Sequence, residues 1–327
     1  MSELIETLED VVRIPLPVGE EYTIRKHRIE LLEGKTKDKK RICIVTGIHG
    51  DELEGQYVCF EIARLLREGA ENLSGIVDIY PALNPFGIDS ITRGIPAFDL
   101  DMNRIFPGSR DGDMNEFIAA KIVEELQGAD LVIDIHASNI FLTEIPQIRI
   151  NELHAKELVP LAKKANMDLI WVHGANTVLE STLAYALNSK GTNTLVVEMG
   201  VGMRITPEYG HQLTNGIFSL MSELGIWTGN PPMVKDSIVA FDADEEDVCY
   251  LNAPCSGIYM KEKVHGSFVE KDELVGRIIN PLSGETMANI KAPENGMIFT
   301  VREYPVVEEG SLMGRILREK VYMEKQL

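Results

Sequence analysis

The sequence predicts an α/β protein: a mixed, mostly parallel sheet flanked by helices, with a smaller all-β domain after it. Three observations lead to this prediction. Over the first 230 residues, short apolar runs rich in β-branched residues alternate with segments of helical periodicity. After a Gly-Asn-Pro-Pro stretch at 229–232 the helical pattern ends, and short strands separated by Gly and Pro follow. An Ala-Pro-x-x-Gly pattern occurs twice in this second part, 39 residues apart.

The first part of the chain reads as strands alternating with helices. Strands are expected in four apolar runs, at 41–47, 75–83, 129–135 and 194–199. Helices are expected where apolar residues recur on one face, at 54–68, 115–126, 158–165 and 207–224. Because parallel strands need a crossover connection, strands separated by helices indicate a largely parallel sheet that is covered on both faces.

The second part contains two similar half-motifs, APCSGI at 253–258 and APENGMI at 292–298. Two similar hairpins can also arise by chance, but the pattern resembles the barrel-sandwich (biotinyl/lipoyl-like) fold. Carrier domains of that fold present a modifiable lysine at a hairpin tip, flanked by Met or by Asp and Ala. The corresponding tip here has neither MKM nor DKA. We therefore expect a catalytic domain over 1–229 and an unmodified, barrel-sandwich-like structural or gating module over 230–327.

Composition narrows the class of protein. The length of 327 residues suggests about two domains. The chain carries 32 Lys and Arg against 51 Asp and Glu, and this net charge of −19 argues against binding nucleic acid or an anionic membrane. No apolar run is long enough to span a bilayer, no signal-like segment opens the chain, and the four cysteines form no CxxC pair. We therefore expect a cytoplasmic protein whose site must be locally positive if the substrate is an anion.

Two histidines and a glutamate follow the ends of predicted strands. His49 and Glu52 form an H-x-x-E pair after the strand at 41–47, and His136 follows the strand at 129–135. Each signal is weak alone, because such spacings are common and a histidine after a strand is more often a core or loop residue. In open α/β sheets, however, ligands bind at the carboxyl ends of strands. Two imidazoles and a carboxylate that leave a fourth position open are typical of catalytic zinc, although cobalt or manganese also suits them.

Three further residues are candidates for the same site. Glu198 lies inside the apolar strand at 194–199, where a carboxylate is expensive to bury without a role. It is either a general base with a raised pKa or a strand-end glutamate that faces water. Arg149 is a second anion contact or a surface arginine, and His173 is kept as a pocket residue.

A polar loop between two predicted elements is a candidate for substrate recognition. It carries Arg93, Asp101, Asn103 and Arg104 within a few residues of one another. Arginine makes bidentate contacts with carboxylates, so such a loop can hold an anionic substrate. The alternative is a solvated loop held together by salt bridges.

Taken in order, GIHGDE, NPFG, Arg93, DMNRIFPG, DIH and VVEMG resemble the zinc carboxypeptidase superfamily over about residues 40–203. The closer resemblance is to the succinylglutamate desuccinylase/aspartoacylase family, in which an appended β module also occurs. The FPG that follows Asn103-Arg104 resembles the branch that includes diaminobutyrate deacetylases of ectoine degradation. The resemblance implies a zinc-carboxypeptidase-like fold and these roles: zinc ligands His49, Glu52 and His136; catalytic carboxylate Glu198; oxyanion-stabilising Arg93; Asn103 and Arg104 on a substrate carboxylate; and Asp101 orienting a zinc-bound histidine.

The expected function is hydrolysis of the amide bond of a small N-acyl amino acid, with one zinc per chain. Two other functions stay open. The chain could be a zinc carboxypeptidase that acts on short peptides, or a non-catalytic binding protein with a vestigial site. The segments at 143–149 and 171–181 are expected to line the acyl side. A dimer or tetramer is compatible with this class of enzyme, but no motif marks an interface.

Overall fold

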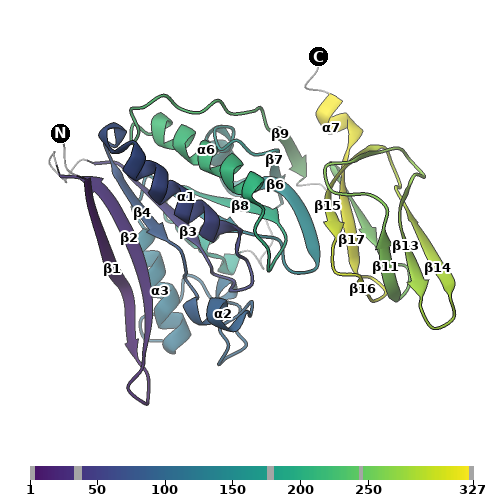
Figure 1. Cartoon of the computed structure of the whole chain (residues 1–327), viewed down its shortest axis with the longest axis horizontal. Helices are drawn as coiled ribbons and strands as arrows, with labels where there is room; N and C mark the ends of the chain where they lie inside the picture. Colours follow the sequence, from purple (N-terminus) through teal and green to yellow (C-terminus); the bar gives the residue numbers. More distant parts are fainter. Residues whose placement is uncertain (1–3, 33–38, 175–179, 243–245, 324–327) are drawn as a thin grey trace.

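The computed structural model describes residues 4–32, 39–174, 180–242 and 246–323. It shows an α/β part joined to an all-β part, at the left and right of Figure 1. The predicted fold class is confirmed, because a large mixed sheet carries helices on its faces and the C-terminal part consists mainly of strands.

Four parallel strands form the centre of the large sheet, in the order β4, β3, β5, β8. They are β3 (Arg41–Thr46), β4 (Ile76–Tyr80), β5 (Leu131–His136) and β8 (Thr194–Gly200). Each coincides with a predicted strand to within a few residues. All are largely buried, as expected of parallel strands that are covered on both faces.

Further strands extend the sheet on both sides, and the sequence did not predict them. On one side, β1 (Leu4–Pro15) pairs with β2 (Glu21–Leu31), and β2 pairs with β4, both antiparallel. On the other side, β6 (Leu142–Asn151) pairs antiparallel with β8. β7 (Leu169–His173) and β9 (Ile238–Asp242) then follow β6 in parallel. The sheet is therefore parallel at its centre and mixed towards its edges.

β2 escaped prediction because charged side chains, Lys26 and Arg28, occupy two of its inward positions. Asp78 of β4 is fully buried and accepts two hydrogen bonds from Arg28, at 2.7 and 2.8 Å. The ammonium of Lys26 lies 3.9 Å from the same carboxylate, and Arg41 lies at 3.4 Å. A buried carboxylate is tolerated only when it is paired, so this cluster replaces the apolar alternation that normally marks a strand.

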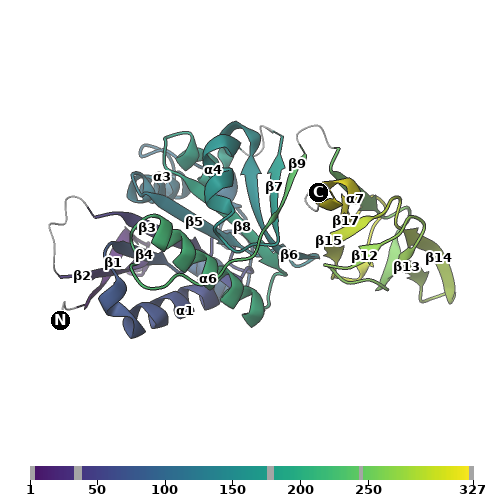
Figure 2. The same ribbon diagram turned by 90° about the horizontal axis from the view of Figure 1, so that it is seen from above.

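Helices cover both faces of the sheet. In Figure 2, α1 and α6 lie on one side and α3 and α4 on the other. The helices of this part are α1 (Glu54–Glu68), α2 (Pro85–Ser90), α3 (Met114–Leu126), α4 (Ala155–Ala162), α5 (Leu183–Asn188) and α6 (Pro207–Glu223). The helices predicted for α1, α3 and α6 are confirmed to within one residue, whereas α4 lies three residues earlier than predicted.

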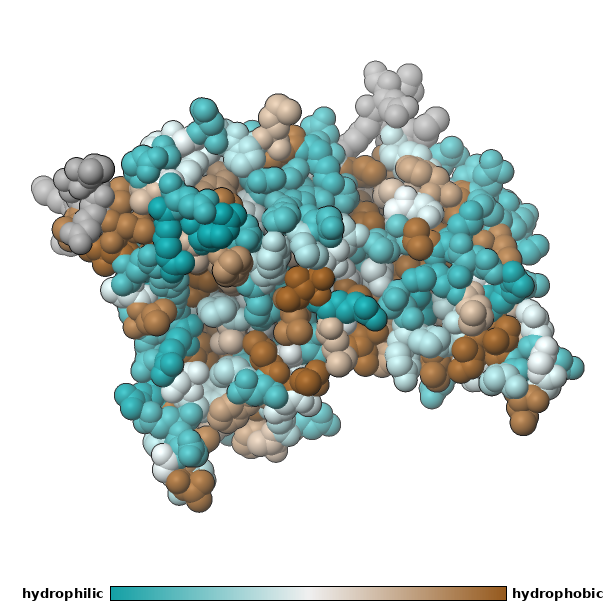
Figure 3. All heavy atoms as spheres, viewed as in Figure 1, coloured by the Kyte–Doolittle hydropathy of each residue, from teal (hydrophilic) through white to brown (hydrophobic). Residues whose placement is uncertain are grey.

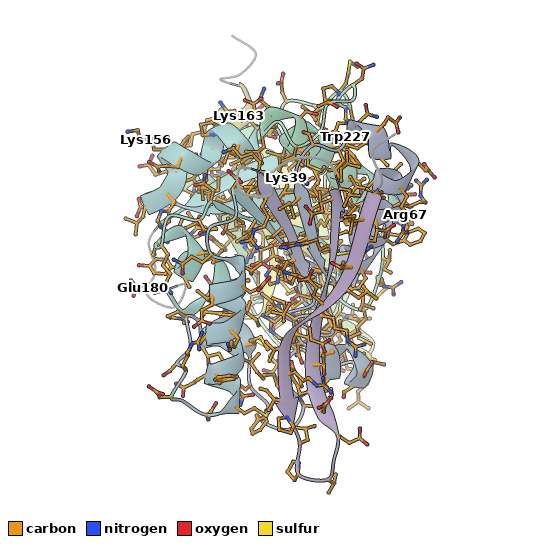
Figure 4. The ribbon with its side chains drawn as sticks, turned by 90° about the vertical axis from the view of Figure 1, so that its left-hand side faces the viewer. Lys39, Arg67, Lys156, Lys163, Glu180 and Trp227 are labelled. Atoms are coloured by element: carbon orange, nitrogen blue, oxygen red, sulfur yellow. The ribbon has the colours of Figure 1, made fainter. Side chains whose placement is uncertain are left out.

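The end of α1 is tied to the outer strand of the sheet. Figure 4, in which β1 faces the viewer, shows Arg67 beside this strand. Its guanidinium donates two hydrogen bonds to Glu6 of β1, at 2.8 and 2.7 Å. Both side chains are partly exposed, so the pair contributes modestly to stability and mainly fixes the position of the hairpin.

The C-terminal part repeats one unit twice. Its strands are β10 (Val248–Asn252), β11 (Gly257–Lys261), β12 (Phe268–Val269), β13 (Leu274–Asn280), β14 (Glu285–Lys291), β15 (Gly296–Arg302), β16 (Val306–Val307) and β17 (Leu312–Arg318), followed by α7 (Glu319–Met323). The order β11, β12, β13 recurs as β15, β16, β17, in register with the repeat seen in the sequence. The two copies exchange their short strands, because β12 pairs with β15 and β16 pairs with β11.

The two parts share strand β6. One edge of β6 pairs with β8, while the other edge pairs with β7 through residues 147–151 and with β15 through residues 142–144. Within the described residues, a single sheet of thirteen strands thus runs through both parts. An apolar cluster at the junction includes Trp171 from the first part and Phe299 and Leu317 from the second.

The predicted division at residues 229 and 230 stays a prediction. The pairing of β9 with β7 shows that the sheet of the α/β part continues to Asp242. The face seen in Figure 3 is mostly hydrophilic, with apolar residues in small scattered groups. None of the described helices combines the length and the apolar character that a membrane span requires.

Candidate active site

His49, Glu52 and His136 converge at the carboxyl ends of β3 and β5. The Nδ1 atom of His49 lies 2.8 Å from Glu52 Oε1, and the Nδ1 atom of His136 lies 3.0 Å from Glu52 Oε2. The two Nδ1 atoms are 3.3 Å apart, and all three side chains are buried. Burial alone would raise the pKa of Glu52, but the two imidazoles hold it well below its usual range. The cluster therefore concentrates lone pairs and one negative charge in a small volume, an arrangement that suits a divalent metal ion.

The opposite nitrogen of each histidine faces its own aspartate. His49 Nε2 lies 3.0 Å from Asp101 Oδ1, and His136 Nε2 lies 3.3 Å from Asp134 Oδ1. A carboxylate behind a ligating imidazole fixes the tautomer and the ring orientation. Asp101 was assigned this part from the family resemblance. Asp134 was not assigned, although its position two residues before His136 on a strand places both side chains on the same face.

The loop that carries His49 and Glu52 packs closely against a second loop. A Cβ atom on Gly50 would come within 2.0 Å of the backbone of Gly87, which lies in the NPFG motif. Asn84 of that motif caps α2, because its side chain accepts a hydrogen bond from the Gly87 amide at 2.9 Å. The two motifs are therefore neighbours in space, and the missing side chain at residue 50 lets His49 and Glu52 reach their positions.

Glu198 lies on β8, where it is the register partner of His136 on β5. Its side chain is 15% exposed and lines the same cavity as the histidine cluster. Burial raises the pKa of Glu198 to about 7, against the opposing charges of Arg149 and His136. A carboxylate with such a pKa can both accept and return a proton near neutrality.

The polar loop brings Arg93 to the edge of the cluster. Arg93 donates a hydrogen bond to Glu52 Oε1 at 2.8 Å and another to Asp101 Oδ2 at 3.3 Å. Its side chain remains 38% exposed and lines the cavity. The guanidinium is thus held by two carboxylates while part of it faces the space above the cluster.

Asn103 and Arg104 follow in a short helical turn at 102–104, which Asp101 caps. The Asn103 side chain is buried, and its Oδ1 accepts a hydrogen bond from the Leu183 amide at 2.9 Å. The amide nitrogen is therefore the end that can donate to a ligand. Arg104 donates to the Asn103 carbonyl at 2.7 Å and also lines the cavity.

Arg149 lies on β6 and contacts Glu198 directly. Its Nη1 atom is 3.2 Å from Glu198 Oε1, and its Nη2 atom is 2.7 Å from Glu144 Oε2. Arg315, from β17 of the C-terminal part, lies 2.8 Å from the other oxygen of Glu144. Neither Glu144 nor Arg315 was singled out from the sequence, because nothing local marks a contact between residues 171 positions apart.

Most of these groups surround one cavity of about 290 Å³. It is lined by every site residue predicted from the sequence except Asp101, and also by Asp134, Glu144, Arg315 and the predicted pocket residue His173. The expected acyl-side segment at 143–149 contributes Glu144 and Arg149 to the lining. Of the segment at 171–181, residues 175–179 lie outside the described part of the chain.

Comparisons with known proteins identify the family to which the chain belongs. Residues 38–224 match the family model described as the succinylglutamate desuccinylase/aspartoacylase catalytic domain. A curated relative, N-alpha-acetyl-L-2,4-diaminobutyric acid deacetylase of Halomonas elongata, is 25% identical over 268 residues, covering 79% of this chain and 76% of the relative.

Several solved structures share the fold. The product-bound ectoine utilization protein EutE (DoeB) from Ruegeria pomeroyi superposes with a TM-score of 0.80 at 20% identity, covering 97% of this chain and 96% of that one. A succinylglutamate desuccinylase from Silicibacter sp. gives a TM-score of 0.81 at 21% identity, covering 97% and 96% of the two chains. Coverage this high means that both the α/β part and the C-terminal strands have counterparts in these structures.

Proposed function

The chain belongs to the succinylglutamate desuccinylase/aspartoacylase family, and from this premise we propose that it is a zinc-dependent hydrolase of small N-acyl amino acids. The proposed reaction is hydrolysis of the amide bond between an acyl group and the amino group of the amino acid. The observation that carries the proposal is the placement of the histidine cluster, Glu198 and the arginine-bearing loop around one cavity.

The three converging side chains fit a metal ion. The nitrogen atoms of His49 and His136 face one carboxylate, and each opposite nitrogen faces an aspartate, as expected of ligands that are oriented from behind. A zinc ion held by His49, Glu52 and His136 would polarise the scissile carbonyl and lower the pKa of a water molecule towards about 7.

Glu198 supplies the proton transfers in the proposed mechanism. It takes a proton from the attacking water and returns it to the nitrogen of the leaving amino acid. One carboxylate can do both because its raised pKa lies close to neutrality. Its partner Arg149 limits where the carboxylate can turn, since the two groups are in contact at 3.2 Å.

Arg93 and the pair Asn103-Arg104 are assigned separate tasks. Arg93 is placed to donate to the oxygen that gains negative charge during attack, and such a donor typically contributes about 10²–10³ in turnover. Arg104 and the amide nitrogen of Asn103 hold the carboxylate of the amino acid, which fixes the amide over the cluster.

The charges around the cavity favour a substrate with one carboxylate. Four arginines line the cavity, and Arg93, Arg149 and Arg315 each pair with a glutamate or an aspartate. Among the described residues, Arg104 has no such ion pair, so it is the cation available to a substrate. We therefore propose that the acyl group is uncharged, as in the N-acetyl substrate named for the Halomonas relative.

The test combines metal analysis with a substrate panel of N-acetyl, N-succinyl and dipeptide compounds, including N-α-acetyl-L-2,4-diaminobutyrate. We expect one zinc per chain and release of acetate. Glu198→Gln should lower turnover by about 10²–10⁴ while zinc stays bound. The matched control is Glu285→Gln, an exposed glutamate on β14.

Each other outcome rejects part of the proposal. Release of a C-terminal residue from the dipeptides would indicate a carboxypeptidase, and absence of both metal and turnover would indicate a binding protein. Faster release of succinate than of acetate would contradict the uncharged acyl group. A cytoplasmic location and a homo-oligomer stay predictions.

A further inference from the structure

We propose that Arg315, in the C-terminal part, is a positioning residue for Glu198 and acts through Glu144 and Arg149. This inference rests on the proposed function, in which Glu198 transfers protons. It gives the C-terminal strands a defined contribution to the site, because they supply the charge that lets Arg149 stay on Glu198.

Four side chains of alternating charge, here called the charge row, connect the two parts of the molecule. They follow one another as Glu198, Arg149, Glu144 and Arg315. The successive contacts are 3.2 Å, 2.7 Å and 2.8 Å. The first two members stand on β8 and β6, and the last stands on β17.

A break in strand register places Glu144 and Arg149 side by side. On a regular strand, side chains five positions apart point to opposite faces. The register of β6 against β8 shifts between Glu144 and Gln147, where Pro146 lies. The shift lets one guanidinium contact Glu144 with Nη2 while it contacts Glu198 with Nη1.

Glu144 needs more than one donor because its side chain is fully buried. One oxygen accepts from Arg315 at 2.8 Å and from Thr300 Oγ1 at 2.9 Å, and the other accepts from Arg149 at 2.7 Å. Removing one partner of a buried ion pair leaves a charge without compensation, which is strongly unfavourable. Without Arg315, Arg149 would be the sole cation within ion-pair distance of both carboxylates among the described residues.

Without Arg315, Glu144 and Glu198 would compete for Arg149, and Glu144 would be the favoured partner. Glu144 has no access to water, whereas the Glu198 side chain is 15% exposed and can be solvated in part. Arg149 is therefore expected to turn towards Glu144 when Arg315 is lost, and Glu198 loses its lateral contact. In the intact protein, Arg315 prevents this competition.

Aromatic rings hold both guanidinium groups in place. Those of Arg149 and Arg315 lie 5.6 and 5.4 Å from the ring centre of Trp171. Tyr250 of β10 lies 5.8 Å from the Arg315 guanidinium. These contacts restrict the rotation of the Arg315 side chain. A change in the position of β17 relative to β6 would therefore change the contact between Arg315 and Glu144.

The test is a double-mutant cycle on Arg315→Met and Glu144→Gln, assayed with N-α-acetyl-L-2,4-diaminobutyrate. We expect Arg315→Met to lower kcat at least tenfold and to change KM less than threefold, with metal content unchanged. Adding Glu144→Gln removes the competing charge, so the double variant should recover kcat to within about threefold of Glu144→Gln alone. Arg315→Lys keeps the charge and should retain most of kcat.

A matched control and a structural measurement accompany the kinetics. Arg302→Met removes another arginine of the C-terminal part, which stacks on Phe141 and donates to the backbone carbonyls of Tyr304 and Val306, and its kcat should stay close to wild type. A crystal structure of Arg315→Met should show Arg149 moved from Glu198 towards Glu144. This measurement does not depend on turnover, and it also applies if the substrate differs.

The outcomes separate this inference from the proposed function. Wild-type kcat in Arg315→Met, independent effects of the two substitutions, or an unmoved Arg149 would each overturn the positioning role. Full turnover in Glu198→Gln would instead overturn the proposed function. If Arg315→Met does not fold, a kcat clearly lower in the double variant than in Glu144→Gln alone would still overturn the proposal, because no buried carboxylate is left unpaired in either protein.

Discussion

At the scale of single residues, some charged side chains of the site are paired with a group of opposite charge and others are not. Glu52 is shared by two imidazoles, and Asp101 and Asp134 each face the rear of one of them. Arg104, in contrast, has no carboxylate partner among the described residues. An arginine without a carboxylate partner is available to a ligand carboxylate, which is why Arg104 is the arginine proposed to bind the substrate carboxylate.

Activity is expected to fall in acid because Glu198 must be unprotonated to accept a proton. Burial raises the pKa of Glu198 to about 7. The ionised form, which can accept a proton, therefore dominates above this pH and is lost as the pH falls through it. A cation on the neighbouring ligands moves this limit downwards. Below the limit we expect kcat/KM to fall about tenfold per pH unit, as measured by initial rates with metal content checked at each pH. A limit above about pH 8, or activity that rises in acid, would contradict this assignment.

At the scale of elements, the loops after β3 and after β4 depend on each other. The backbone of Gly87 passes so close to residue 50 that no side chain fits there. This contact explains the glycine at position 50, whereas a Cβ atom on Gly87 would come within 2.3 Å of the Asn84 side chain. The first loop carries His49 and Glu52, the two proposed metal ligands that are close in sequence, and the second loop packs against it.

Gly50→Ala is expected to push these loops apart. A Cβ atom 2.0 Å from backbone forces a shift, and overpacking of this kind typically costs about 1–3 kcal/mol. We expect a lower free energy of unfolding in denaturant and weaker zinc binding in a competition with a chelator. Gly284→Ala is the control, because its Cβ atom would meet nothing and only its φ of +75° is unfavourable. Equal zinc affinity in the two variants would contradict this view of the loops.

Sequence patterns predicted the elements whose faces are uniformly apolar and missed those that mix charges with apolar residues. The central strands follow from short apolar runs, and three of the helices follow from helical periodicity. β2 did not, because the inward residues Lys26 and Arg28 gain their partner Asp78 only in the folded chain. The convergence of His49, Glu52 and His136 could be predicted because these residues follow strand ends. Glu144 and Arg315 could not, because their contact is set by the pairing of β6 with β15.

At the scale of the whole molecule, the two parts are joined by the pairing of backbone strands and by a shared apolar cluster. β15 adds to the edge of β6, and Trp171, Phe299 and Leu317 pack in one cluster at the junction. A junction with both strand pairing and an apolar cluster resembles the interior of a domain more than a contact between separate domains. The parts should therefore behave as one body.

The full chain is expected to unfold in a single cooperative thermal transition. A chain truncated after Asp242 loses the partner strand of β6 and exposes Trp171 and Ile145, so it should aggregate or unfold at a lower Tm. Calorimetry and size-exclusion chromatography measure both effects. Two separate transitions in the full chain, or a monomeric truncated chain with unchanged Tm and zinc content, would contradict this expectation.

The repeated unit in the C-terminal strands has a consequence for how this protein can change over evolution. Strands β15 and β17 of the second copy belong to the large sheet, and β17 carries Arg315, whereas β11 and β13 of the first copy lie in the separate four-stranded sheet with β14 and β16. After such a duplication, the two copies are under different structural constraints. The copy that carries Arg315 is proposed to contribute to the site and is therefore expected to keep its shape, whereas the strands of the other copy are expected to diverge more freely.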